Sequence, residues 1–224
     1  MKISNIPVLL SFVLPSIGLA QIAVTYNFDT LDDAMAPSLV EGAHFTPSAF
    51  GYSGTGTFSI QSGTGGTSSY AASANGWNIP GNYFTFSIAL DPGYVFQATQ
   101  LSFDGRVTST GPTDLEVFSS ANDFATSIHT FPPESTGSFD PYIVDLSEVG
   151  LVANTFEIRI HGNDASLGAG TFRVDNATLT GTITAVPEPS AVACCIGIAV
   201  LIPLVWNRSR KQVHNSQRTR KYRS

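Results

Sequence analysis

Carboxylate and imidazole side chains are the groups in this sequence with the clearest capacity for chemistry. Asp32 and Asp33 are adjacent, and glycoside hydrolysis uses two carboxylates that flank the scissile bond. Neighbouring residues on an extended chain point to opposite faces, however, so we interpret Asp32 and Asp33 as a solvated pair beside a turn in preference to a catalytic pair. His44, His129 and His161 are scattered, and a zinc site would require them to converge from distant segments. With no nucleophile elbow, phosphate loop or H-E-x-x-H motif either, we expect no enzyme.

Aromatic side chains suggest a second kind of chemistry, the binding of sugars. Trp77 lies in NGWNIP (75–80), and Tyr70 and Tyr52 are near it in the sequence. An exposed aromatic ring can serve as a platform for a glycan, which makes these three residues candidate glycan contacts. The alternative is that Trp77 closes one end of the domain as a buried plug.

Short β-strands must position these side chains. Eight segments are rich in β-forming residues and are separated by turns that contain Gly, Pro, Asn and Ser. They are residues 22–28, 57–62, 82–90, 94–103, 114–120, 141–147, 155–162 and 170–184. No helical periodicity longer than about two turns accompanies them. This pattern predicts an all-β fold, a single jelly-roll-like β-sandwich over residues 21–184.

Alternation along the strands predicts which side chains form the core. Phe84, Phe86 and Ile88 share one face of residues 82–90, and Phe156, Ile158 and Ile160 share one face of residues 155–161. In the closing strand, strict alternation places Phe172, Val174, Asn176 and Thr178 opposite Arg173, Asp175, Ala177 and Leu179. The apolar rows should pack between two sheets.

The charge of the chain is divided unevenly. All 17 acidic residues lie between Asp29 and Glu188, and residues 21–190 carry only three arginines, for a net charge of −14. Such a domain repels nucleic acid and acidic polymers, so a neutral glycan is the better candidate ligand. Both cysteines, Cys194 and Cys195, follow this region, which therefore has no disulfide.

The N-terminus has the pattern of a secretory signal peptide. Lys2 provides a positive charge, an apolar stretch follows, and Gly18 and Ala20 are small residues at the positions that precede cleavage. The apolar stretch is too short for a membrane anchor. Residues 1–20 should be removed on export, so that the mature chain begins at Gln21.

The C-terminal segment combines three parts in a fixed order. Pro187, Glu188 and Pro189 hold an extended backbone, and the 16 uncharged residues 191–206 form a predicted transmembrane helix of about 24 Å. This helix is short for a bilayer and ends at Trp206, a residue that prefers the interface. The cations that follow it, Arg208, Arg210 and Lys211 with the basic tail 212–224, should stay cytoplasmic.

This three-part arrangement over residues 185–211 resembles the PEP-CTERM sorting signal. The resemblance implies that an exosortase, a membrane transpeptidase, recognises residues 187–189 after the helix has anchored the chain transiently in the inner membrane. It also implies a Gram-negative bacterium that makes exopolysaccharide, and delivery of the processed protein to the cell surface or extracellular matrix. A plain single-pass anchor is the alternative interpretation of the same residues.

The exported domain in turn resembles the jelly-roll domains that often precede this signal. The likeness rests on GNYFTFSIALDPGY (81–94), LSFDGRVTSTGP (101–112) and FRVDNATLTG (172–181). In similar carbohydrate-binding jelly rolls an Asp of the closing strand helps to hold a structural calcium. The resemblance therefore implies Asp175 as a calcium ligand, with Asp29 as a partner. The alternative is that both residues cap turns or accept hydrogen bonds.

Two functional hypotheses follow. The first is an exported, non-enzymatic surface or matrix protein that is sorted by an exosortase and associated with exopolysaccharide. The second is a carbohydrate-binding module that recognises a neutral glycan, with or without structural calcium.

Overall fold

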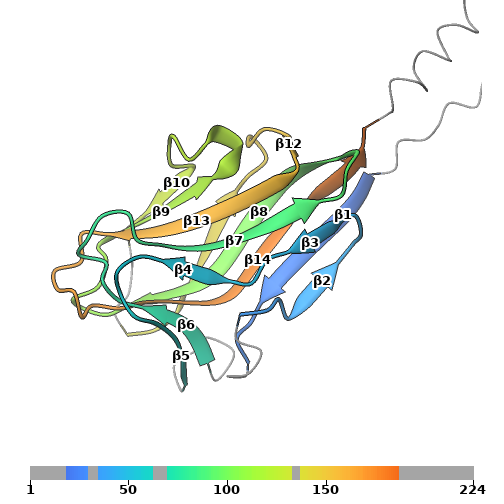
Figure 1. Cartoon of the computed structure of the whole chain (residues 1–224). Coiled ribbons are helices and arrows are strands. Elements are labelled where there is room, and N and C mark those ends of the chain that lie inside the picture. The colour runs from blue at the N-terminus through green and yellow to red at the C-terminus, as the bar shows by residue number, and fades with distance from the viewer. Residues whose placement is uncertain (1–18, 30–34, 63–69, 133–136, 187–224) are drawn as a thin grey trace, which may run out of the picture. The chain divides into compact units, whose positions relative to one another are not determined.

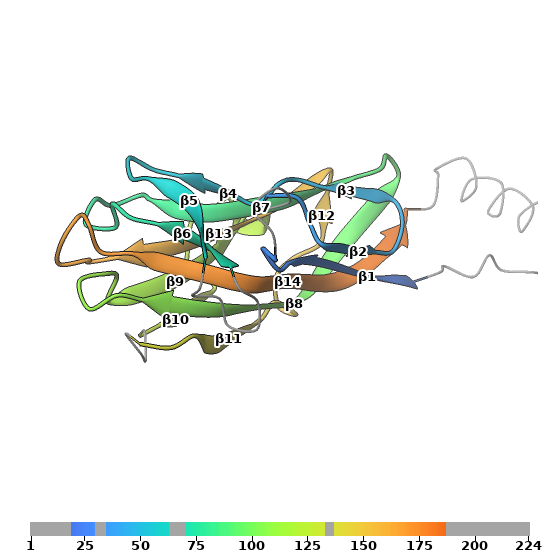
Figure 2. The same cartoon turned by 90° about the horizontal axis from the view of Figure 1, so that it is seen from below.

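Two antiparallel β-sheets pack face to face and form a sandwich, shown from two directions in Figures 1 and 2. The structure, a computed structural model, describes residues 19–29, 35–62, 70–132 and 137–186. The predicted all-β sandwich is confirmed over these residues. The narrower jelly-roll assignment stays a prediction.

The eight-stranded sheet is built around the two longest strands, β8 (Tyr94–Val107) and β14 (Phe172–Ala185), which pair with each other. Its main path runs β11-β8-β14-β1-β2, in which β11 is Asp140–Asp145, β1 is Leu19–Tyr26 and β2 is Leu39–Glu41. Three further strands join it: β12 (Val152–Ala153) on β8, β6 (Tyr70–Ala74) on β14, and β5 (Phe58–Ser62) on β6.

The six-stranded sheet carries the strands that matter most for the site. Its main path runs β10-β9-β13-β7-β3, and β4 (Gly51–Ser53) also pairs with β7. The other bounds are β10 His129–Phe131, β9 Asp114–Ser119, β13 Thr155–Asn163, β7 Tyr83–Leu90 and β3 Phe45–Pro47. A one-turn 3-10 helix, Ser120–Asn122, follows β9 directly.

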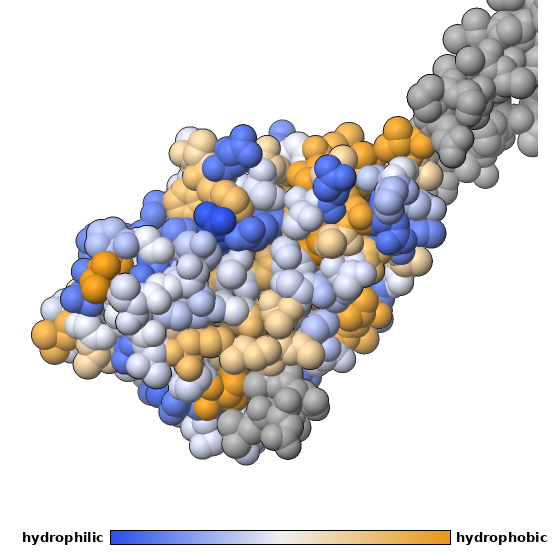
Figure 3. Space-filling view, viewed as in Figure 1, coloured by the Kyte–Doolittle hydropathy of each residue, from blue (hydrophilic) through white to orange (hydrophobic). Residues whose placement is uncertain are grey.

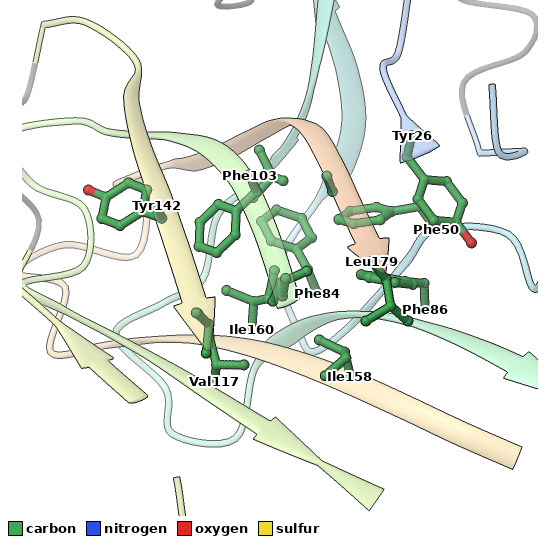
Figure 4. Packing of buried hydrophobic residues seen from close by; sticks show 14 of the residues in the cluster. Tyr26, Phe50, Phe84, Phe86, Phe103, Val117, Tyr142, Ile158, Ile160 and Leu179 are labelled. Carbon is green, nitrogen blue, oxygen red and sulfur yellow. The ribbon is translucent and has the colours of Figure 1, made fainter. Parts of the chain in front are cut away.

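The core lies between the sheets and is rich in aromatic rings, as Figure 4 shows. Phe84 and Phe86 of β7 and Ile158 and Ile160 of β13 are at most 1% exposed, as alternation along these strands predicts. Leu179 of β14 faces them from the other sheet. Tyr26 is also buried, and its hydroxyl donates a hydrogen bond to the carbonyl of Ser48 at 2.6 Å, so the polar end of the ring is satisfied.

Strict alternation is wrong for the closing strand. Its register against β8 shifts between Asp175 and Thr178, and Asn176 at this bulge has a φ of 50°, in the left-handed region. The extra residue reverses which side chains face inward beyond it. Phe172 and Val174 before the bulge are buried as expected, but Ala177 and Leu179 after it are buried in place of Asn176 and Thr178.

All eight predicted strands are present, but six short ones were not predicted. The short strands are β2, β3, β4, β6, β10 and β12, which have two to five residues each. So few residues contain too little alternation to detect, and β6 has the sequence YAASA, in which every residue after the tyrosine is small. β1 begins at Leu19, two residues before the predicted start of the mature chain.

Several predicted features lie outside the described residues. These are most of the signal peptide, Asp32 and Asp33, the sorting motif Pro187-Glu188-Pro189, the helix 191–206 with Trp206, and the cations from Arg208 onward. Within the described part of the chain, no helix has the length and apolar character needed to cross a membrane.

Candidate functional site

Trp77, the first predicted glycan contact, is a buried residue between β6 and β7. It is only 1% exposed, and its indole Nε1 donates a hydrogen bond to the carbonyl of Ala74 at 2.7 Å. Its ring lies 5.2 Å from that of Phe84 and 5.6 Å from that of Phe172, centroid to centroid. Trp77 therefore has no open ring face, and the plug alternative describes it better.

Tyr52 and Tyr70 also pack against the core. The ring of Tyr52 meets Trp77 edge to face at 5.4 Å, and its hydroxyl donates to the carbonyl of Asn75 at 2.8 Å. Burial raises the pKa of the Tyr52 hydroxyl above its usual value. Tyr70 is half-buried at the start of β6. These three residues do not form an exposed platform.

The two implied calcium ligands lie in different environments. Asp175 sits at the bulge of β14, is fully buried, and accepts a hydrogen bond from the backbone N–H of Asn176 at 2.8 Å. Asp29 follows β1, is exposed, and accepts a hydrogen bond from Asn27. Because Tyr26 pairs with Ala177, the chain leaves β1 close to the bulge. No group of three or more metal-binding side chains gathers among the described residues, so calcium at Asp29 and Asp175 stays a prediction.

The outer face of the six-stranded sheet carries an ordered row of polar and aromatic side chains that is not among the predicted site residues. Register places Tyr83 of β7 beside His161 of β13, His161 beside Glu116 of β9, and Glu116 beside Thr130 of β10. Cross-strand partners lie about 5 Å apart on the same face of a sheet. Four strands therefore present one continuous row, which we call the outer row.

His161 is held between two aromatic rings in this row. The centroid of its ring is 4.9 Å from that of Tyr83 and 4.8 Å from that of Phe118. Burial, and secondarily the charge of Arg159, lower the pKa of His161 to about 4. The imidazole is therefore neutral at physiological pH and can both donate and accept a hydrogen bond.

Arg159 extends the aromatic surface along β13. Its guanidinium carbon lies 3.5 Å from the ring centre of Phe124 and 4.6 Å from that of Tyr83, both within cation–π range. Its Nε donates to Glu157 at 2.8 Å, and the hydroxyl of Thr85 donates to the same carboxylate oxygen at 3.1 Å. Phe124 reaches this position from a left-handed backbone conformation with a φ of 57°.

A pocket of about 390 Å³ lies at one end of the outer row. It is lined by Trp77, Asn78 and Pro80 from the β6–β7 connection, by Asp114 and Glu116 of β9, and by Thr130, Asn163 and Asp164. The amide of Asn163 donates to Glu116 at 2.7 Å, which fixes the orientation of that carboxylate. Trp77 is thus one of the lining residues of the pocket even though its ring faces are covered.

Figure 3 shows the outer face of the six-stranded sheet in front, with hydrophilic residues interspersed among weakly hydrophobic ones. The alternation that places Phe156, Ile158 and Ile160 on one face of residues 155–161 leaves Glu157, Arg159 and His161 on the other face, so part of this surface could be predicted. The missing information was strand order. Nothing in the sequence indicates that β9 and β7 flank β13, and that arrangement brings Tyr83, His161 and Glu116 together.

No protein-family profile and no curated protein matches the chain in sequence. Similar solved structures include the CBM22-1 xylan-binding domain of Xyn10C from Paenibacillus barcinonensis, with a TM-score of 0.43 and 9% identity over 73% of this chain and 94% of that one. A family 29 carbohydrate-binding module complexed with mannohexaose has a TM-score of 0.41 and 15% identity over 73% and 93%.

The K2 cleaved adhesin domain of Lys-gingipain is similar at a TM-score of 0.42, with 15% identity over 70% of this chain and 98% of that one. At these scores and identities the likeness carries no conclusion about the fold, the ligand or the site of this chain. The strand pairing by itself shows that the described domain is a two-sheet β-sandwich.

Proposed function

We propose that the β-sandwich is a non-enzymatic domain that binds a neutral glycan on the outer face of its six-stranded sheet. The observation that carries this proposal is the outer row, Tyr83–His161–Glu116–Thr130, which leads into the pocket. The row lies on regular strands, so its side chains are held at a set spacing before any ligand arrives.

The chemistry of the row suits a sugar. A pyranose ring presents apolar C–H groups on its faces and hydroxyls around its edge. The partly exposed ring of Tyr83 in the row and that of Phe118 beside it offer apolar surface, while Glu116, the neutral His161 and Thr130 accept or donate hydrogen bonds. Apolar contact with a few placed polar groups is the usual composition of small-molecule sites.

Binding to a panel of glycans tests this proposal. The full chain, purified in mild detergent, is measured against xylan, mannan, glucan and polyuronate oligosaccharides, with calcium and with a chelator. We expect at least one neutral glycan to bind, and Tyr83→Ala to weaken it about tenfold, which corresponds to about 1.4 kcal/mol. Tyr94→Ala, which removes a half-buried tyrosine of the eight-stranded sheet, is the matched control and should bind normally. A panel without any bound glycan would contradict the proposal.

The same samples test the absence of catalysis. Asp114 and Glu116 lie two residues apart on one face of β9, about 7 Å along the strand, and a pair of carboxylates is the group that glycoside hydrolysis uses. Bound oligosaccharides should therefore be followed for new reducing ends. We expect none, and hydrolysis abolished by Glu116→Gln would show that the domain is an enzyme.

We further propose that this domain is exported and delivered to the cell surface or matrix by an exosortase. The support comes from the sequence: a signal peptide, the Pro187-Glu188-Pro189 motif, a short apolar helix and a basic cluster. Glu188→Gln keeps the size and extension of the motif but removes its charge. If the carboxylate is recognised, this variant should accumulate in the membrane fraction at full length. Processing at the wild-type rate would show that the exosortase does not recognise the charge of Glu188.

A further inference from the structure

The pocket at the end of the outer row is half open to solvent, and all of its charged lining residues are acidic. Asp114, Glu116 and Asp164 contribute three carboxylates, and no Lys, Arg or His is among the lining residues. In the described part of the chain, ion pairs join only His44 to Asp91 and Arg159 to Glu157, so the pocket carboxylates have no cationic partner there. The pocket is therefore strongly anionic when it is empty.

The arrangement of these carboxylates argues against a metal ion. A hard cation such as calcium needs six to eight oxygen ligands at about 2.3–2.6 Å. No cluster of three or more metal-binding side chains exists among the residues that the structure describes, so these three carboxylates line the cavity without converging on one point. A volume of about 390 Å³ lies within the usual range for small organic ligands.

The walls of the pocket are preformed. Trp77 is fixed by its hydrogen bond to Ala74 and by its contacts with Phe84 and Phe172. Glu116 is oriented by the amide of Asn163 at 2.7 Å. Little conformational freedom is lost when a ligand enters such a site, so the cost of binding is low.

We propose that this pocket is the subsite for a sugar residue that carries a protonated amino group, within a glycan that otherwise lies along the outer row. This inference rests on the proposed glycan-binding function and adds one cationic residue to a ligand that is otherwise neutral. An ammonium group supplies three donors and a positive charge, and charge-assisted hydrogen bonds to carboxylates are the stronger kind. Thr130 and Asn163 remain to bond the sugar hydroxyls.

The surroundings of the pocket favour the same class of ligand. Arg159, the cation on β13, is already paired with Glu157 and stacked on Phe124. Its charge is therefore engaged outside the pocket and does not neutralise the pocket carboxylates. His161, beside Glu116 in the row, is neutral at physiological pH and does not offset the carboxylates. N-acetylation of the sugar would remove the ligand charge and leave the carboxylates without a cation.

Matched oligosaccharides of glucosamine and N-acetylglucosamine test the inference by titration calorimetry on the full chain near pH 6, where an amine is protonated. We expect the free-amine form to bind at least tenfold more tightly, with an advantage that shrinks as salt is added. Asp114→Asn should remove most of this advantage, because it keeps the shape of the side chain but removes its charge. The control Asp145→Asn changes an exposed carboxylate on the eight-stranded sheet.

Each outcome is decisive for one of the two proposals. Equal affinity for the two oligosaccharides, or a preference for the acetylated form, overturns the amino-sugar subsite but keeps the glycan-binding function. Equal weakening by Asp114→Asn and Asp145→Asn indicates general attraction to an acidic protein and also overturns the subsite. Failure of every glycan, including the neutral panel, overturns the proposed function itself.

Discussion

The two faces of the six-stranded sheet use the same strands for different purposes. On β7, Phe84 faces inward and is completely buried, whereas Tyr83, the preceding residue, faces outward and is half-buried. On β13, Ile160 and His161 show the same contrast. The inner side chains stabilise the fold by leaving water, while the outer ones keep part of their surface and hydrogen-bonding capacity for a ligand.

The aromatic contacts of the two faces differ in number as well as in burial. The ring of Phe84 has five aromatic neighbours, Phe50, Tyr52, Phe58, Trp77 and Phe172, at centroid distances between 5.2 and 5.9 Å. The ring of His161 has two, Tyr83 and Phe118. Changes on the inner face should therefore unfold the domain, and changes on the outer face should mainly alter binding.

The largest effect on stability should come from Phe84→Ala. Removing a fully buried ring loses apolar burial and leaves a cavity among five aromatic neighbours, so the free energy of unfolding should fall by about 3–5 kcal/mol. Tyr83→Ala, one residue away on the outer face, should cost about 1 kcal/mol or less. Urea denaturation of both variants measures the difference. Equal losses of unfolding free energy in the two variants would mean that the inner and outer faces contribute equally to stability.

Gly162→Ala should have the next largest effect, because this residue joins the core to the pocket wall. A Cβ atom at this position would lie 2.6 Å from Cγ of Pro112 and 2.9 Å from Cε3 of Trp77. Overpacking of this kind costs about 1–3 kcal/mol in unfolding free energy. Gly150→Ala is the control, since nothing lies within 4 Å of its Cβ position. Thermal melts should show a clear loss for the first variant and almost none for the second.

The pH dependence of stability should report the environment of His161. Its folded pKa, about 4, lies below the ordinary 6.5, so the unfolded chain takes up the proton first as pH falls. This contribution to stability is complete above about pH 6.5 and is lost progressively toward pH 4. After allowance for its partial solvent exposure, we expect a loss of about 1 kcal/mol. Urea denaturation at several pH values measures this loss. In His161→Gln the free energy of unfolding should fall by about 1 kcal/mol less between about pH 7 and pH 4.5 than in the wild type. An equal fall in both proteins would contradict the lowered pKa of His161.

The smallest effect should come from the ion pair on the outer face. Nε of Arg159 lies 2.8 Å from Oε1 of Glu157, but the side chains of Glu157 and Arg159 remain 29% and 26% exposed. Glu157→Gln should lower the free energy of unfolding by only about 0.5 kcal/mol, because solvent screens the pair. The loss should shrink further in high salt. A loss above that of Gly162→Ala would show that this part of the outer face is structural.

Much of the fold could be predicted from local pattern. Alternation with a period of two is a property of the strand itself, so Phe84, Phe86, Phe156 and Ile158 were assigned to the core without knowledge of their partners. The same reasoning failed at Asn176, where a bulge adds one residue and shifts the alternation. Nothing in the local pattern of FRVDNATLTG marks that bulge, because it depends on pairing with β8.

The candidate site was much less accessible from the sequence. Trp77 stood out by residue type, yet its burial depends on contacts with Tyr52, Phe84 and Phe172 from three different parts of the chain. Glu116 did not stand out, because one carboxylate among 17 acidic residues carries no signal of its own. Its place beside His161 is a consequence of strand pairing.

The sequence by itself determined the properties that act over a few residues or over the whole chain: strand periodicity, net charge, and the order of segments at the two ends. The tertiary structure alone decided the order of β9, β13 and β7, the position of the bulge in β14, and the formation of the pocket between β9 and the β6–β7 connection. The physical reason is that long-range strand pairing joins residues whose separation along the chain sets no distance between them, so only the packed sheets can bring Tyr83, His161 and Glu116 into one row.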